Sequence, residues 1–176
     1  NWKMIKGATG FSLGIKSDGT LWGWGDNVWG QLGDSTYLGK LIPTQVNTDT
    51  TWDLISTGHR HVLAIKKNGT LWAWGENLWG ELGMNDTISR NFPVQIGIDT
   101  SWKEVSGGYN FSVAIKNDGT LWAWGHNDHG QLGDGSYVNH LVPTQIGTDT
   151  NWKSISSGQY HLLALKNDNT IWTCGA

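Results

Sequence analysis

Apolar and polar residues alternate in short runs that return at a fixed interval along the chain. In residues 102–146 the runs read WKEVSGG, FSVAIK, TLWAWG and LVPTQI, each bounded by Gly, Asn, Asp or another polar residue. Such alternation is typical of β-strands, and no segment has a convincing helical period outside the long third-to-fourth connection. Asp118-Gly119 joins the second and third runs and predicts a tight hairpin, since Gly adopts positive φ without steric cost. The pattern predicts four short antiparallel strands per unit.

The unit repeats every 50 residues without insertion or deletion. The same step relates four sets of residues: Trp2, Trp52, Trp102 and Trp152; Gly25, Gly75, Gly125 and Gly175; Pro43, Pro93 and Pro143; and Asp49, Asp99 and Asp149. Four strands at this period predict an all-β fold, a β-propeller of four-stranded blades. The Gly-rich first strand suits the crowded axis, and the fourth strand, whose Pro cannot donate to a ladder, suits the outer edge.

The chain is predicted to be one propeller segment, residues 1–176, with repeats 1–50, 51–100, 101–150 and a partial repeat 151–176. This gives three complete blades plus three strands of a fourth. Propellers have roughly 4–8 blades, so the ring can close in three ways: by further repeats of a longer chain, as a small four-bladed ring, or between two chains. Two chains would give six full and two short blades, and we favour a segment of a larger propeller or an oligomer.

One phrase recurs almost unchanged: GTLWGWGDNVWGQLG from Gly19, GTLWAWGENLWGELG from Gly69 and GTLWAWGHNDHGQLG from Gly119. This phrase resembles the repeat of the regulator of chromosome condensation family, and the resemblance covers the whole chain. It implies a propeller that usually has about seven blades and binds protein partners. In the last copy Asn169 replaces the hairpin Gly and Cys174 replaces the second Trp. The near-identical units, rich in Thr, Asn, Asp and Gly, also resemble tandem repeats of large bacterial secreted proteins.

Composition excludes several classes of function. The 12 Lys and Arg residues against 15 Asp and Glu residues give a net charge of -3, which argues against nucleic acid as the main partner. The single Cys excludes an internal disulfide framework, and no apolar run is long enough for membrane insertion.

Strand parity sorts the connections onto two faces. The second-to-third turns and the blade-to-blade links are nearly identical in every repeat, whereas the first-to-second and third-to-fourth loops differ; we call the latter side the variable face. Binding residues concentrate on loops held by a rigid scaffold, and Trp, Tyr and Arg are the usual anchors of protein interfaces. The predicted partner-binding residues are Trp29, Trp79, His129, Tyr37, Tyr137, His59, Arg60 and Tyr109.

Tryptophans have a structural interpretation beside the functional one. Trp29 and Trp79 are equally well explained by packing beneath their own loops, because large aromatic residues are mostly buried. The pairs Trp22/Trp24, Trp72/Trp74 and Trp122/Trp124 are interpreted as core between blades rather than as sugar-stacking platforms, with one member expected to face each neighbouring blade.

Neither a metal site nor an active site is predicted. His61 shares its repeat position with Phe11 and Phe111, which indicates packing. His126, Asp128, His129 and His140 lie close in sequence, but zinc needs three or four convergent ligands. Asp49, Asp99 and Asp149 are interpreted as turn residues of the links, and no catalytic motif and no cofactor motif is present.

The sequence therefore predicts a non-enzymatic binding or scaffold module that engages a protein partner through the variable face. Two alternatives remain open: a carbohydrate-binding propeller whose loop aromatic residues stack on sugars, and a purely structural repeat region of a large secreted or surface protein. The low Lys content and Thr/Asn-rich loops favour an extracellular or cell-surface location.

Overall fold

The computed structural model describes all 176 residues. The chain forms fifteen strands joined by turns and loops, and it contains no helix. The strands form four antiparallel sheets in which each strand pairs with the next along the chain. We call these sheets blades 1 to 4. Blade 1 contains β1 (Trp2–Gly7), β2 (Phe11–Lys16), β3 (Leu21–Gly25) and β4 (Lys40–Gln45), and blade 2 contains β5 (Trp52–Thr57), β6 (His61–Lys66), β7 (Leu71–Gly75) and β8 (Arg90–Gln95). Blade 3 contains β9 (Trp102–Gly107), β10 (Phe111–Lys116), β11 (Leu121–Gly125) and β12 (His140–Gln145), and blade 4 contains β13 (Trp152–Ser157), β14 (His161–Lys166) and β15 (Ile171–Gly175).

The predicted strands, their order and the repeat register are confirmed. The predicted hairpin turn between β10 and β11 contains Gly119 at a φ of 80°, where a Cβ atom would lie 2.1 Å from the carbonyl oxygen of Thr150. Only Gly fits this turn, because its backbone also touches the link that leads to the next blade. The strand containing Pro143 lies at the outer edge of its sheet, as predicted, where a missing N–H costs no ladder bond.

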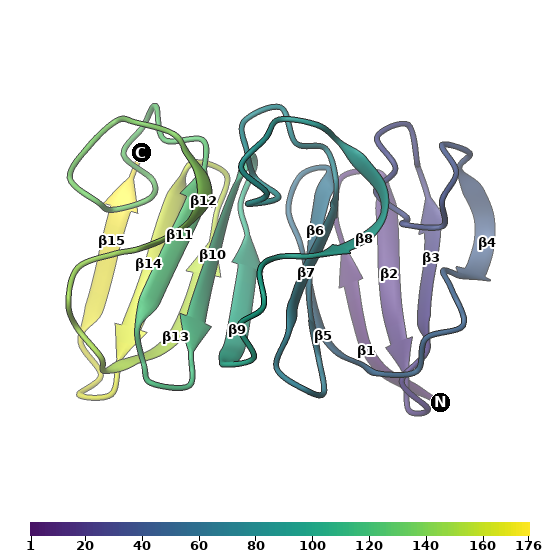
Figure 1. Ribbon diagram of the computed structural model, residues 1–176, viewed down its shortest axis with the longest axis horizontal. Helices are drawn as coiled ribbons and strands as arrows, with labels where there is room; N and C mark the ends of the chain where they lie inside the picture. Colours follow the sequence, from purple (N-terminus) through teal and green to yellow (C-terminus); the bar gives the residue numbers. More distant parts are fainter.

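The blades stand side by side in a row, with their first strands adjacent to one another (Figure 1). The long loops gather at the top of this view and the tight hairpin turns at the bottom. Three clusters of buried hydrophobic residues occupy the three junctions between adjacent blades, one cluster for each junction. A propeller blade is covered on both faces by its neighbours, so its core lies between sheets rather than within a single sheet.

Blades 1 and 4 lie at opposite ends of the row (Figure 1), and no core cluster joins them. The chain therefore forms a partial ring and not the small closed four-bladed ring that the sequence left open. Trp2 on the outer face of blade 1 is 45 % exposed, and Leu163 and Ile171 on the outer face of blade 4 are 42 % and 72 % exposed. At the inner junctions the equivalent first-strand Trp52 and Trp102 are buried.

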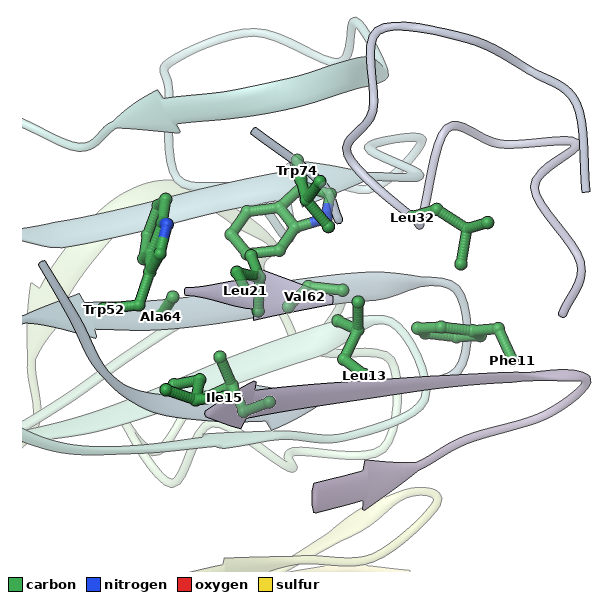
Figure 2. Packing of buried hydrophobic residues seen from close by; sticks show 11 residues of the cluster. Phe11, Leu13, Ile15, Leu21, Leu32, Trp52, Val62, Ala64 and Trp74 are labelled. Carbon is green, nitrogen blue, oxygen red and sulfur yellow. The ribbon is translucent and has the colours of Figure 1, made fainter. Parts of the chain in front are cut away.

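The expectation that paired Trp residues face opposite neighbours is wrong. Trp72 and Trp74 both pack against blade 1, and Ala73 between them faces blade 3. Positions i and i+2 of a strand point to the same side of a sheet, so the pair shares one face. Figure 2 shows Trp74 and Trp52 packed on the blade 1 residues of this core. The interpretation of the pairs as core is confirmed, and the Nε1 atom of Trp74 donates to the Gln31 carbonyl at 3.0 Å.

Candidate functional site

The variable face is built on long loops that are tied down from within. Asn77, fully buried at the start of the β7–β8 loop, donates through Nδ2 to the carbonyls of Asp86 at 3.0 Å and Ile88 at 3.2 Å. Its Oδ1 atom accepts from the Leu82 backbone N–H at 2.9 Å. Asn27 and Asn127 bind their own loops in the same way. One side chain therefore fixes both ends of each loop.

Each long loop also contains a polar contact of an Asp side chain. Asp34–Lys40 at 2.9 Å and Asp86–Arg90 at 2.7 Å are ion pairs, and Asp134 Oδ2 forms a hydrogen bond with His140 Nε2 at 2.7 Å. Burial would raise the pKa of Asp134, but hydrogen bonds from His140, Ser136 and Asn127 outweigh it and lower the pKa to about 2. The Asp charges of the first two loops are thus neutralised by a cation of the same loop. Tyr37 and Tyr137 are exposed on the long loops of blades 1 and 3.

A repeated contact crosses every blade junction on this face. The Arg60 guanidinium of blade 2 lies 5.6 Å from the ring centre of Trp29 in blade 1. One repeat later the Trp79 indole nitrogen lies 3.2 Å from the side-chain amide of Asn110, whose oxygen accepts the indole N–H when the amide is oriented so that both its atoms are paired. The His129 ring lies 4.8 Å from the Tyr160 ring in the third instance. Each loop aromatic residue therefore sits over the short loop of the next blade.

Aromatic rings of the short first-to-second-strand loops also contact one another from blade to blade. His59 and Tyr109 stack at 3.9 Å with an angle of 13° between their planes, and Tyr109 lies 5.5 Å from Tyr160. Burial, with a smaller effect of the Arg60 charge, lowers the pKa of His59, so this ring is neutral at neutral pH. His59 and Tyr109 line a hollow of about 370 Å³, which Thr9, Gln159 and glycine backbone also border.

Together these side chains form a band across three junctions, which we call the aromatic crescent. It consists of Trp29, His59, Arg60, Trp79, Tyr109, His126, His129 and Tyr160. Six of the eight predicted binding residues belong to it, and Tyr37 and Tyr137 stand apart on the outer loops. Trp79 is 39 % exposed and Trp29 is half-buried, and each contacts the next blade; their packing is therefore not confined to their own loops.

Sequence reasoning missed Asn110, His126 and Tyr160. The His126 ring lies 4.2 Å from the Trp79 ring. The signal that could have found these residues is the comparison of equivalent positions between repeats. Two of these positions change in every repeat: Arg60, Asn110 and Tyr160 are equivalent, as are Asp26, Glu76 and His126. Linking these positions requires the blade-stacking geometry, which the strand pattern does not contain.

The histidines occupy separate environments. His61 is fully buried, bonds Ser112 Oγ at 3.0 Å, and has its pKa lowered by burial to about 3, in agreement with its predicted packing role. His126 pairs with Asp128 at 2.9 Å, whereas His140 pairs with Asp134. No group of three or more His, Cys, Asp or Glu side chains converges as a metal site would require. The chain contains no helix that could cross a membrane.

The opposite face carries a repeated structural cluster. Asp49 Oδ1 accepts from the backbone N–H of Thr51 at 2.8 Å, which agrees with its predicted role as a turn residue. Its other oxygen lies 2.6 Å from Lys66 Nζ, a contact that the sequence analysis did not predict. Asp99–Lys116 and Asp149–Lys166 repeat the ion pair.

Four-stranded antiparallel blades stacked through Trp-rich junctions define a segment of a β-propeller with a variable loop face. The family model "Regulator of chromosome condensation (RCC1) repeat" matches residues 18–65, 68–115 and 118–165, and a second model of that description matches residues 102–131. The chain belongs to the RCC1 repeat family. A comparison with curated protein sequences gave no match.

Solved structures confirm the fold. A structure of Kap60 bound to yeast RCC1 (Prp20) contains a chain that is 21 % identical with a TM-score of 0.88, and the match covers 99 % of this chain and 44 % of that chain. Prp20p from Saccharomyces cerevisiae gives 21 % identity, a TM-score of 0.89 and coverages of 99 % and 45 %. Human WBSCR16 gives 22 %, 0.87, 99 % and 48 %. The chain therefore spans less than half the length of these proteins.

Proposed function

We propose that the chain is a non-enzymatic scaffold segment that binds a protein partner through the aromatic crescent. The observation that carries this proposal is the repeated contact across three blade junctions, which arranges Trp, Tyr, His and Arg side chains on one rigid surface. Aromatic residues and Arg dominate the binding energy of protein interfaces. Loops clamped by buried Asn side chains lose little conformational entropy on binding, which favours affinity.

The similar structures provide a parallel. One is described as bound to Kap60, and another is described with binding properties to Gsp1p and histones. Those descriptions concern those proteins, and the low identity carries only the fold to this chain. They support a protein as the class of partner. We propose that the chain itself belongs to an extracellular or cell-surface protein, in keeping with its Thr/Asn-rich loops.

A glycan is the second candidate, and the ring geometry favours it less. Sugar stacking needs a free aromatic face, whereas the Trp29 ring lies under Arg60 and the Trp79 ring lies against His126. Two exposed tyrosines, Tyr37 and Tyr137, remain available on separate loops. A purely structural repeat is the third candidate and would show no discrete partner at any face.

Affinity capture from the source organism followed by titration with the purified partner tests the proposal. We expect Arg60→Ala and Trp79→Ala each to weaken the partner Kd by tenfold or more, because each removes an anchor near the centre of the crescent. Lys67→Ala and Asn117→Ala on the opposite face serve as the matched controls and should leave the Kd unchanged. Equal weakening by both sets, or a glycan as the sole ligand captured, would overturn it.

A further inference from the structure

The residue beneath each loop aromatic side chain is Gln in blades 1 and 3 and Glu in blade 2. Gln31, Glu81 and Gln131 are all fully buried. In every case a side-chain oxygen accepts the backbone N–H of the residue two positions earlier: Trp29 at 2.8 Å, Trp79 at 2.7 Å and His129 at 2.9 Å. The three side chains therefore have one common task, which is to hold the start of the variable loop.

The other end of the side chain distinguishes blade 2. Gln31 Nε2 donates to Asp26 Oδ2 at 3.1 Å, and Gln131 Nε2 lies 3.4 Å from His126 Nδ1. The equivalent atom in blade 2 is Glu81 Oε1, which is buried and has no hydrogen-bond partner. The residue at the Asp26 position is Glu76, itself only 5 % exposed. Two carboxylates thus occupy the place of a donor and an acceptor.

No cation faces the Glu81 carboxyl directly. Arg60 of the β5–β6 loop approaches Glu76 at 3.9 Å. His61 of β6 is neutral and reaches Glu81 only through Ser112 of β10, whose hydroxyl donates to the Glu81 carbonyl at 2.7 Å. From the β11–β12 loop, His126 contacts the Trp79 ring and pairs with Asp128.

We propose that Glu81 binds a proton that it donates to Glu76, and that this proton site makes the position of Trp79 in the aromatic crescent depend on pH. A protonated carboxyl has the shape of the Gln side chain and supplies the single donor that blade 2 lacks. Burial raises the pKa of Glu81 to about 7 and also raises the pKa of Glu76.

Loss of this proton leaves the carboxylates of Glu76 and Glu81 both negatively charged in a buried site, where their repulsion is only weakly screened. The Glu81 side chain relieves the repulsion by moving from beneath Trp79, which releases the loop residue that it holds. The proton site rests on the geometry of blade 2 alone. Its effect on partner binding rests on the proposed function, so the two are tested separately.

The first experiment follows the side-chain carbon of Glu81 and the indole N–H of Trp79 by NMR in the intact protein between pH 5 and 8.5. We expect both signals to titrate together with a midpoint near 7. Glu81→Gln should hold the Trp79 signal at its low-pH position throughout, and this variant should fold because two repeats already carry Gln there. Gln31→Glu, which faces Asp26, should create a second titration reported by Trp29.

A Glu81 midpoint near its ordinary value of 4.5 would overturn the proton site. A Trp79 signal that shows no pH dependence in the wild-type chain would overturn its coupling to Trp79. Partner affinity is then measured at pH 6 and pH 8 in both proteins. A confirmed titration without a change in affinity would overturn the regulation of binding, whereas loss of binding at both pH values on Trp79→Ala would still support the proposed function.

Discussion

The ammonium nitrogen of Lys66 lies 3.5 Å from the ring centre of Trp72. The same nitrogen lies 4.6 Å from the Trp52 ring and 2.6 Å from Asp49 Oδ2, so the cation is enclosed by two indoles and a carboxylate. Trp52 and Trp72 meet edge to face with 5.8 Å between their centres. Because Asp49 belongs to the link that enters blade 2, this contact fastens the link to the sheet that follows it.

Replacing Lys66 with Met tests how much the charge contributes. Met preserves the aliphatic packing but removes the cation–π and ion-pair contacts, and we expect the free energy of unfolding to fall by about 1–2 kcal/mol in urea denaturation. Lys16 offers a matched control, because it lies 3.5 Å from the Trp22 ring but pairs with no carboxylate. Lys16→Met should cost less; equal losses would show that Asp49 adds nothing.

Asn77→Ala removes the clamp of the β7–β8 loop. Three backbone groups of the loop lose the side chain that binds them, and buried unpaired groups cost about 1–3 kcal/mol each before relaxation. We expect a loss of at least 2 kcal/mol in urea and faster hydrogen exchange at Leu82 and in residues 84–89. Thr87→Ala, on the exposed part of the same loop, should change neither. Unchanged exchange in the Asn77 variant would contradict the clamp.

Gly83→Ala tests the packing of the blade 2–blade 3 junction. Gly83 has a φ of 73°, and a Cβ there would lie 2.9 Å from Trp124 Nε1, which donates to the Glu81 carbonyl. Gly147→Ala is the control, since its φ is 64° but nothing lies within 4 Å of the added atom. Both variants pay the backbone cost of about 1 kcal/mol. We expect only Gly83→Ala to cost a further 1–3 kcal/mol and to change Trp fluorescence; equal costs would place Trp124 elsewhere.

The repeat register, strand bounds and outer position of Pro143 could be predicted from the sequence, because turn residues and two-residue periodicity are local properties. The variable face followed from strand parity. The contact of Trp79 with Asn110 could not, since it depends on how far one blade overlaps the next. Nor could the buried state of Glu81, which the sequence shows only as a conservative change from Gln. The sequence also contained the information that Trp72 and Trp74 share one face of their sheet, because side chains two positions apart in a strand point to the same side. The prediction of opposite faces was therefore wrong for a reason that is local to the strand.

Glu81 makes the stability of the protein depend on pH in a direction opposite to that of its surface carboxylates. Its pKa is about 7 in the folded chain against an ordinary value of 4.5, so the unfolded chain releases this proton at lower pH. The free energy of unfolding therefore falls as pH rises from 4.5 to 7, by roughly 3 kcal/mol for this group, and stays low above 7. Asp99, whose pKa is lowered to about 2 chiefly by the hydrogen bond from Lys116, acts the other way, and its contribution to the free energy of unfolding is lost as pH falls from 3.8 toward 2.

Urea denaturation of the wild-type protein and of Glu81→Gln at pH 5 and pH 8 separates these effects. The two proteins should be similar at pH 5, and the variant should be more stable at pH 8 by about 2–3 kcal/mol. Equal stabilities at pH 8 would show that Glu81 is ionised without cost in the folded chain.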